Sequence, residues 1–517
     1  MGTLDGRLIR GILAGLRGGG AEADKAETVG RESRATLTKL RRNFQPVVSV
    51  LSARSAFSVL SCATNPATGE RQIILVSESQ EIEMGLQGAR ETVQAIPPVA
   101  DSGIQRFTRT IGLRMAQASE RPQLPWSFVV LDDASVNAFA YPGGPIFVTR
   151  GILTHMNSEA ELAGVLGHEI GHITARHSAS QISKAQLLSA GLIVGSIVSP
   201  VVRDLSGVAS VGLGLLFLKY GRDAENQADE LGFRYMTKDG YDPRAISSVF
   251  QMLALTSALA GQGRLPEWQS THPYPEDRVE NNDQRVAQLT QNPSTMKVNR
   301  TAYVREIDGL VFGEDPRQGF FEGTRFNHPD LRFRFDFPAG WKTQNQPAAV
   351  VGQSANQDAL MSLSFAQAAS PRDAMQQFLG QQGIRAGQTS NAAINGFTAS
   401  WAEFEATTAD GVFVGQIAYV QDGSRIYQIL AYTTSAGYRT YSSVFQQSIH
   451  SYNRLTDQAA LNKQPVRLHM VQINRDMTIE QFNQSYPSTI KIDYLAAINA
   501  VQPGERIPSG SWVKQVR

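Results

Sequence analysis

Apolar residues recur at helical spacing through most of residues 75–300, so this part of the chain is predicted to be mainly helical. One stretch departs from that pattern. Residues 125–150 contain two apolar runs, SFVVLDD and NAFAYPGGPIFVTR, which are typical of strands. The Pro-Gly-Gly-Pro turn inside the second run predicts a hairpin. We therefore expect a helical domain over residues 63–300 that includes a small sheet.

The pattern changes after residue 300. Residues 301–325 are rich in Gly, Asp and Arg and are predicted to connect two domains. Apolar and charged residues then alternate strictly from Leu331 to Phe337, which is typical of a half-buried strand. Pro338 ends that strand, because proline cannot donate to a strand ladder.

A second hairpin is predicted at Val412–Thr433, where Asp422-Gly423 supplies a tight turn between two alternating arms. A helix is expected next, over residues 438–452. Residues 326–455 are therefore predicted to form an α+β domain. Residues 465–517 follow as a shorter module that ends in an apolar strand.

The N-terminal part differs from the rest. Residues 1–43 show no sustained apolar period and are expected to be disordered. A basic stretch and an apolar stretch then lead to Cys62, an order typical of an export signal. The residues VLSC resemble a bacterial lipoprotein cleavage box, which predicts a lipid anchor on Cys62 and a disordered arm and signal over residues 1–62. The alternative is a free cysteine in a disordered arm.

Composition narrows the function. The chain has 517 residues, of which 42% are hydrophobic and 18% charged, as expected for several globular domains. Its net charge of +1 gives no attraction to nucleic acid, so no such partner is expected. With Cys62 as the only cysteine, a transition metal has to be bound by histidine and carboxylate side chains.

Residues 158–177, SEAELAGVLGHEIGHITARH, carry the strongest chemical signal. The Ser158–Glu161 pair has the spacing of a capping box and predicts that a helix starts there. His168 and His172 are four residues apart, so both imidazoles lie on one face and can bind one ion. Glu169 is next to the first ligand, where it can act on water without binding the metal.

A second predicted helix, over residues 220–233, supplies carboxylates. Glu225 and Asp229 are again four residues apart and lie on one face beside small alanines. A catalytic zinc needs three protein ligands and an open position, so one carboxylate can bind the ion while the other holds a ligand imidazole. The alternative for this pair is a solvated acidic face.

These motifs, with Thr271-His272-Pro273 and Arg278, resemble the HtpX/BepA-like family of gluzincin zinc metalloproteases, metallopeptidase family number forty-eight. The resemblance covers residues 62 to about 290 and implies one zinc ion per chain. It implies that the metal ligands are His168, His172 and Glu225. It also implies that Glu169 is the catalytic base, that Asp229 supports a ligand, and that His272 lies near the metal. By this resemblance, His272 either blocks the fourth metal position at rest or polarises the substrate carbonyl. The alternative is that His272 is a surface residue with no role at the metal.

Other segments resemble further modules. Asn137-Ala-Phe-Ala-Tyr-Pro-Gly-Gly resembles the family's substrate-pairing edge strand, and TNPATGERQ after Cys62 resembles the start of its periplasmic lipoprotein members. Residues 326–455 resemble α/β modules of the PsbP/Mog-like kind. Residues 465–517 resemble a LysM module, which implies contact with peptidoglycan; the alternative is a plain packing module.

The resemblance implies a zinc-dependent endopeptidase of the bacterial cell envelope that cleaves unfolded or misassembled proteins. Glu169 would assist the attack of zinc-bound water on the peptide bond. The protein would lie in the periplasm, anchored by lipid to the outer membrane. Two other functions stay open: a chaperone or assembly factor for outer-membrane proteins, and a wall-binding adaptor with a structural zinc. The expected fold class is α+β: a mainly helical zincin domain with a small edge-strand sheet, a smaller α/β domain and a short LysM-like module.

Overall fold

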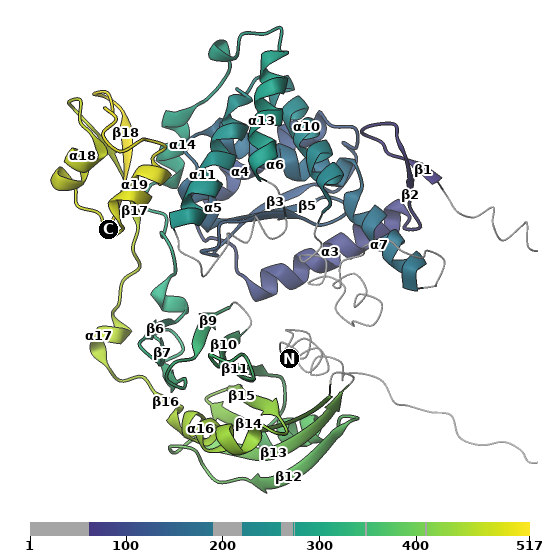
Figure 1. Cartoon of the computed structure of the whole chain (residues 1–517), viewed down its shortest axis with the longest axis vertical. Helices are drawn as coiled ribbons and strands as arrows, with labels where there is room; N and C mark the ends of the chain where they lie inside the picture. The colour runs from purple at the N-terminus through teal and green to yellow at the C-terminus, as the bar shows by residue number, and fades with distance from the viewer. Residues whose placement is uncertain (1–61, 190–219, 260–271, 273–274, 347–348, 409–410) are drawn as a thin grey trace, which may run out of the picture.

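The computed structural model describes most of the chain after residue 61, namely residues 62–189, 220–259, 272, 275–346, 349–408 and 411–517. A helical part, a sheet domain and a C-terminal module follow one another along the chain (Figure 1). This mixture of helices and sheets confirms the predicted α+β class. The expectations for residues 1–61 lie outside the described residues. Every helix among the described residues is too short or too polar to cross a membrane.

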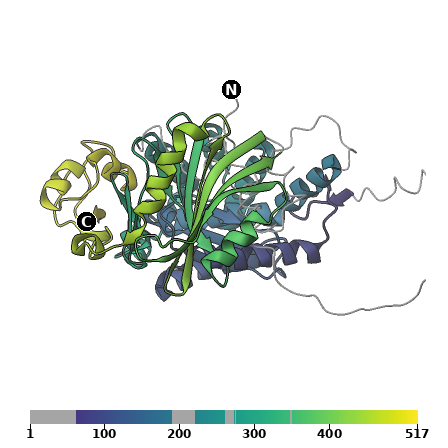
Figure 2. The ribbon, with the colours of Figure 1, turned by 90° about the horizontal axis from the view of Figure 1, so that it is seen from below.

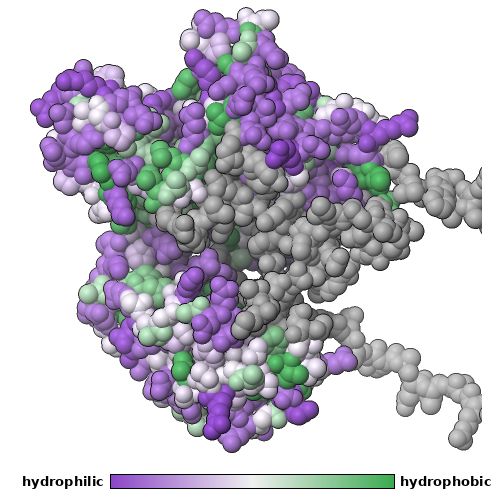
Figure 3. Space-filling model, in the orientation of Figure 1, coloured by the Kyte–Doolittle hydropathy of each residue, from purple (hydrophilic) through white to green (hydrophobic). Residues whose placement is uncertain are grey.

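The helical part is centred on α6 (Glu159–Thr174), in which every side chain is buried. The surface of this part is mostly hydrophilic in the view of Figure 3. The other helices surround α6: α3 (Glu78–Ala95), α4 (Ser102–Gln117), α5 (Arg150–His155), α7 (His177–Ser189), α10 (Arg222–Lys238), α11 (Arg244–Leu259), α13 (Pro275–Ala287) and α14 (Arg300–Ile307).

The small sheet of the helical part has the strand order β3 (Ser127–Leu131), β5 (Pro145–Thr149), β4 (Ala138–Ala140). Strand β5 is parallel to β3 and antiparallel to β4. The β4–β5 pair is the hairpin that the Pro-Gly-Gly-Pro turn predicts, and β4 is an edge strand. The residues after position 61 form another hairpin, β1 (Cys62–Thr64) with β2 (Arg71–Ile73), which was not predicted.

The start of α6 follows the sequence prediction. The Ser158 side chain accepts a hydrogen bond from the Glu161 backbone N–H, so the helix begins at Glu159. The Glu161 carboxylate accepts from the Asn157 N–H at 2.6 Å, one residue before the N-cap. This satisfies a backbone donor at the buried helix entrance.

Glycines let α6 and α10 approach closely. A methyl group at Gly171 would lie 2.9 Å from the Ala228 carbonyl oxygen, and one at Gly232 would lie 2.8 Å from the His168 nitrogen. Neither contact leaves room for a larger side chain. The loss of helix propensity at these glycines is thus offset by backbone contact between the helices that carry the predicted ligands.

The sheet domain contains a seven-stranded antiparallel sheet with helices α15 (Pro371–Leu379) and α16 (Tyr438–Ser451) (Figure 2). Side chains alternate between the faces: Ile417 packs in the cluster with α15, while Ala418 packs in the cluster with α16. In order across the sheet, the strands are β12 (Ile384–Ser390), β13 (Thr398–Thr408), β14 (Gly411–Asp422), β15 (Arg425–Thr434), β11 (Ala359–Ala366), β10 (Ala349–Gln353) and β9 (Lys342–Asn345).

The sheet domain confirms three sequence predictions. Strands β14 and β15 form the hairpin with its turn at Asp422-Gly423, and α16 is the expected helix. The alternating segment is β8 (Phe333–Asp336), with both phenylalanines buried. It belongs to a four-stranded sheet with the order β16 (Asn453–Arg454), β8, β7 (Arg325–His328), β6 (Phe320–Glu322).

The segment predicted as a connector, residues 301–325, contains regular structure. Most of α14 lies in it, and Tyr303 and Ile307 are fully buried in the same apolar cluster as α6. The Tyr303 hydroxyl donates to the Leu153 carbonyl at 2.6 Å. The segment ends with the 3-10 turn Pro316–Gln318 and β6, so its two ends are built into the two neighbouring parts.

The C-terminal module packs on the helical part, although the sheet domain separates them in the sequence (Figure 1). Its apolar residues share one continuous cluster with α6 and α11. The module runs β17 (Leu468–Gln472), α18 (Ile479–Ser485), α19 (Ile492–Ile498) and β18 (Trp512–Val516), with the two strands antiparallel.

Candidate metal centre

Helix α6 places its two histidines side by side. The His168 Nε2 and His172 Nε2 atoms lie 3.0 Å apart, and both side chains are buried. Helix α10 brings Glu225 beside them, with its carboxylate oxygens 3.6 Å from each of these nitrogens. The nitrogens and the carboxylate that the sequence predicts as ligands thus face one another.

His272 joins this group from a loop. Its Nδ1 lies 3.0 Å from a Glu225 oxygen and 3.2 Å from His168 Nε2. One ligand atom from each of His168, His172, Glu225 and His272 can be chosen so that all four lie within 4.8 Å of one another. With only 2% of its surface exposed, His272 is not a surface residue.

Asp229 lies behind His168. Its Oδ1 is 2.8 Å from His168 Nδ1, the ring nitrogen that faces away from the other histidines. Arg278 donates to both Asp229 oxygens at 2.6 and 2.7 Å. Burial opposes ionisation of Asp229, but Arg278 and His168 outweigh it and lower its pKa. The ionised Asp229 therefore holds His168 with Nδ1 protonated and Nε2 free to bind a metal.

Arg278 itself is directed towards carboxylates. It bonds Asp229, and its Nη1 lies 3.3 Å from a Glu225 oxygen, while its guanidinium lies over the Phe250 ring at 4.2 Å. These contacts make Arg278 the cation that neutralises Asp229 and Glu225 on α10.

Glu169 is buried beside the ligand group but is not part of it. Its Oε1 lies 3.6 Å from His272 Nε2 and has no hydrogen-bond partner among the described residues. Burial, with the negative charge of Glu225 adding to it, raises its pKa well above the usual value. A buried carboxylate oxygen without a partner, next to potential metal ligands, has the position and basicity of a general base.

The donor set fits a metal ion. Two imidazoles and a carboxylate are typical zinc ligands. Burial raises the pKa of Glu225 to about 7 and lowers that of His272 to about 3, so the site penalises charge on its own side chains. A divalent cation would reverse this for the carboxylates, because its charge favours their ionised forms.

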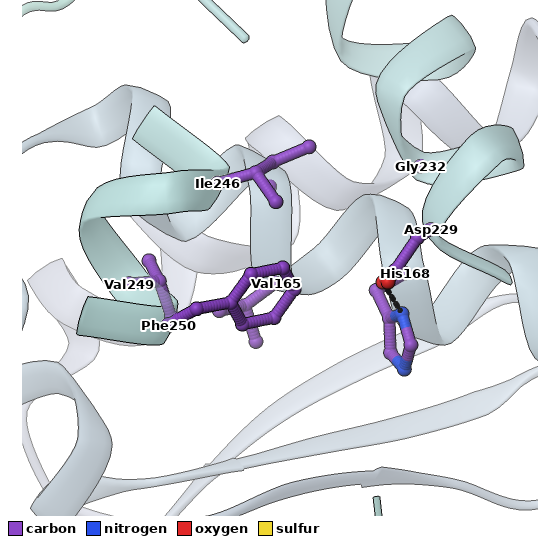
Figure 4. Close-up of a pocket in the computed structure, with 8 residues that line it drawn as sticks. Val165, His168, Asp229, Gly232, Ile246, Val249 and Phe250 are labelled. Atoms are coloured by element: carbon purple, nitrogen blue, oxygen red, sulfur yellow. Dashed lines mark hydrogen bonds and ion pairs between the residues drawn. The ribbon is translucent and has the colours of Figure 1, made fainter. Parts of the chain in front are cut away.

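A small pocket adjoins His168 on the side of α11 (Figure 4). Figure 4 shows Val165, Ile246, Val249 and Phe250 around it, with Asp229 bonded to His168 at its edge. Its exposed lining is almost wholly apolar. The pocket is a packing gap behind the ligand, and its two polar side chains, His168 and Asp229, bond each other.

Two neighbours of His172 were missed by sequence reasoning. The Tyr220 ring stacks on His172 with centroids 4.0 Å apart, and His177 Nδ1 lies 2.9 Å from His172 Nδ1. His177 follows the second ligand by five residues, a spacing that no helical face repeats. Tyr220 lies just before the helix that carries Glu225. Only its closeness in sequence to Glu225 could have drawn attention to it.

Comparison with known proteins gives one family match. Residues 105–286 match the family described as Peptidase family M48, and this segment contains all the ligand candidates. The match confirms, for this segment, the resemblance to gluzincin metalloproteases that the sequence predicts. The family is zinc-dependent, so zinc is the ion that this donor set fits.

Similar proteins come from bacteria and mitochondria. The beta-barrel assembly-enhancing proteases of Yersinia pestis and Escherichia coli (strain K12) are each 27% identical, over 44% of this chain and 48% of their own length. The mitochondrial metalloendopeptidase OMA1 of Arabidopsis thaliana is 34% identical over 34% of each chain. The chain thus spans about half the length, or less, of these relatives.

The chain also aligns with solved structures. Cyanobacterial PsbP from Synechocystis sp. PCC 6803 covers 26% of this chain and 95% of its own, with 14% identity and a TM-score of 0.23. A score this low does not establish a shared fold.

Proposed function

We propose that this chain is a zinc-dependent endopeptidase of the bacterial cell envelope that cleaves unfolded or misassembled proteins. One observation carries the proposal. Four buried side chains offer ligand atoms within 4.8 Å of one another, and the unpartnered Glu169 oxygen lies beside them. Similarity to proteases named for beta-barrel assembly supports the envelope setting.

His168, His172 and Glu225 would hold the ion, and Glu169 would act as the base. When bound, zinc supplies Lewis acidity that activates water and polarises a carbonyl group. Glu169 accepts the proton of the attacking water on its unpartnered Oε1 and can pass it to the leaving amine.

We propose that His272 fills the fourth position while no substrate is present. Its Nδ1 is among the four converging ligand atoms, which supports this role. A site closed by four protein ligands is typical of structural zinc, so the same contact is the main support for a non-catalytic adaptor. Displacement of His272 by substrate would distinguish the protease from the adaptor, because only the protease needs an open metal position.

Substrate would bind in an extended form along β4. This strand is the edge of its sheet and packs against α6, which carries the ligands. An edge strand recognises a peptide through main-chain hydrogen bonds with weak demands on its side chains. This mode suits unfolded chains. It equally suits a chaperone or assembly factor, the second candidate, since the bacterial relatives are named for beta-barrel assembly as well as for proteolysis.

The location proposed is the periplasm, with a lipid anchor on Cys62 at the outer membrane. Cys62 is the first residue of β1, directly before the helical part, so an anchor there would hold the protease domain close to the membrane. The module of residues 465–517 has two helices between two antiparallel strands, and we propose that it is LysM-like and contacts peptidoglycan.

The test compares the full chain with Glu169→Gln on a permanently unfolded protein substrate, with zinc measured in both. Wild type is expected to cleave and to carry one zinc. Glu169→Gln is expected to keep the zinc and to lose cleavage, because it removes a base and leaves every ligand in place. Equal cleavage by both proteins would contradict the mechanism. Zinc without cleavage in wild type, joined to suppression of aggregation, would favour the chaperone.

A further inference from the structure

A line of polar side chains runs from His172 to the N-terminal hairpin. His177, the first residue of α7, places its Nδ1 2.9 Å from His172 Nδ1. Its other ring nitrogen, Nε2, lies 2.9 Å from the Gln227 side-chain oxygen on α10. His177 is buried, with 6% of its surface exposed, so these contacts are not interchangeable with bulk water.

The line continues into the loop that joins β1 and β2. The Asn65 side-chain amide donates to the Gln227 oxygen at 3.1 Å, and the Gln227 amide donates to a Glu70 oxygen at 3.1 Å. Asn65 is buried, although its loop is at the molecular surface. A hairpin far from α6 in the sequence is thus connected through two side chains to a proposed metal ligand.

Proton positions along this line are fixed by the metal ligand itself. If His172 binds the ion through Nε2, its Nδ1 must carry the proton and donate. His177 then accepts on Nδ1 and, as a neutral imidazole, carries its proton on Nε2, from which it donates to Gln227. Gln227 continues the same direction of hydrogen bonds, because its oxygen accepts from His177 and its amide donates to the Glu70 carboxylate. Every contact in the line is consistent with this one direction.

We propose that His177 is a positioning residue that fixes the tautomer and ring orientation of His172, and that Gln227 and the β1–β2 hairpin hold His177 in place. The proposal rests on the proposed zinc site. His177 does for His172 what Asp229 does for His168: each accepts from the ring nitrogen that faces away from the ion. Arg278 holds Asp229, and Gln227 with the hairpin holds His177.

A role as a metal ligand does not fit His177. Its near nitrogen faces Nδ1 of His172, on the side of that ring opposite the converging Nε2 atoms. The potential ligand group among the described residues also leaves it out. Tyr220 fixes the plane of the His172 ring by stacking, whereas His177 fixes which nitrogen carries the proton.

The hairpin makes one more contact near this point, from a side chain to the backbone. The Gln72 side chain donates to the Ala175 carbonyl at 3.1 Å, in the turn between α6 and α7. The segment directly after Cys62 therefore supports both the turn that carries His177 and the side chain that holds it. Loss of the hairpin's contacts should weaken zinc binding without touching a ligand.

The experiment measures zinc affinity of the full chain by competition with a chromophoric chelator, together with the visible spectrum of the cobalt-substituted protein. His177→Phe keeps an aromatic ring, although a larger one, and removes both nitrogens. We expect a loss of zinc affinity on the order of ten- to a hundredfold, with an altered cobalt spectrum, because outer partners of ligand histidines have effects of this size. Gln227→Leu should cause a smaller loss in the same direction.

His177→Asn provides the rescue. Its side-chain oxygen takes the place of Nδ1 and can accept from His172, so we expect affinity between those of wild type and His177→Phe. His450→Phe, on an exposed histidine of the sheet domain, is the matched control and should bind zinc like wild type.

Two results would overturn the proposal: wild-type affinity and spectrum in His177→Phe, or equal losses in the Phe and Asn variants that follow their losses of thermal stability. A wild-type chain that binds no zinc would refute the zinc site itself, which is a separate failure.

Discussion

The two ends of α6 both bury charged groups, but they treat them differently. In the first turn, the Glu161 carboxylate accepts hydrogen bonds from the Asn157 N–H and from the Ser158 hydroxyl. In the last two turns, the Glu169 Oε1 has no hydrogen-bond partner among the described residues, and two imidazole nitrogens face one another. Other buried side-chain atoms also lack partners, among them Asn157 Oδ1 at the first turn, but the Glu169 oxygen lies beside four potential metal ligands, and this position marks the end of the helix that can bind an ion.

The first turn of α6, which we call its structural end, depends on contacts with the C-terminal module. Lys514 of β18 is 1% exposed and donates from Nζ to three carbonyl oxygens, those of His155, Met156 and Ile498, at 3.0, 2.7 and 2.8 Å. Three acceptors match the three N–H groups of an ammonium. Burial lowers the pKa of Lys514 and raises that of Glu161, and the opposite charge of each group counteracts the other's shift. Here the cations Lys514 and Arg300 counteract the charge of Glu161, whereas the other end offers ligand atoms that could hold a metal ion.

The largest effect is expected from substitutions at the metal end of α6, the last two turns with their proposed ligands. Glu225→Ala and His168→Ala should each leave the purified chain with almost no zinc, because a three-ligand site cannot lose a ligand and keep its affinity. Zinc added in large excess should raise the melting temperature of wild type and not of these variants, since a ligand stabilises only the state that binds it. Glu230→Ala, on the exposed side of α10, is the control. Normal zinc content in either variant would remove that residue from the ligand set.

The second largest effect is expected from a substitution at the structural end of α6. Lys514→Met should lower the free energy of unfolding by about 3–5 kcal/mol, because it leaves three carbonyls buried without their donor and removes one of the two cations that act on Glu161, the other being Arg300. Chemical denaturation of the zinc-loaded chain measures this loss. Lys514→Met with Glu161→Gln should lose less than Lys514→Met alone, because the unpaired charge is then absent. A double variant as unstable as the sum of the single ones would show that the two charges are not coupled.

A smaller effect is expected one contact away from the metal. Asp229→Ala should weaken zinc binding on the order of ten- to a hundredfold while keeping one zinc per chain, because His168 loses the partner that sets its tautomer. Competition with a chelator measures the affinity. Unchanged affinity would show that Arg278 and the packing of α10 suffice to orient His168.

The residues of the metal end could be predicted from the sequence, whereas at the structural end only the helix start at Ser158 and Glu161 could be predicted. His168, Glu169 and His172 lie within one helical turn, so their spacing alone places them together. Glu225 and Asp229 repeat that spacing on a second helix. Their meeting with α6 depends on the close packing of the two helices at Gly171 and Gly232.

Lys514 and His177 carried no such signal. Lys514 meets α6 only because the C-terminal module folds back past the sheet domain, and a contact across that sequence distance leaves no local period. His177 is five residues after His172 and starts a new helix, so its direction depends on the turn at Ala175 and Arg176. The 301–325 segment shows the same limit, since its polar composition hides the buried Tyr303.

The smallest predicted effect tests whether the structural end is sensitive to pH. His155, at the end of α5, lies with Nδ1 2.7 Å from the Gly151 carbonyl and Nε2 2.8 Å from the Tyr494 hydroxyl of the C-terminal module. Burial, with the charge of Lys514 adding to it, lowers its pKa from 6.5 to about 4. Above pH 6.5 neither the folded nor the unfolded chain carries a proton here, and stability is unaffected. As the pH falls from 6.5 towards 4, the unfolded chain takes up the proton first, so stability decreases.

Between pH 7.5 and 5.5 this group should therefore cost about 1 kcal/mol of unfolding free energy, which His155→Gln should abolish because its amide does not titrate. The measurement is the difference between the pH dependences of wild type and variant under zinc-saturating conditions, so that the metal ligands contribute equally to both. His450→Gln, at an exposed position, is the control and should leave the pH dependence unchanged. Parallel curves of unfolding free energy against pH for wild type and His155→Gln would mean that His155 takes up a proton in the folded chain as easily as in the unfolded chain. The contrast between a metal-dependent and a metal-independent end of α6 would then have to rest on Lys514 alone.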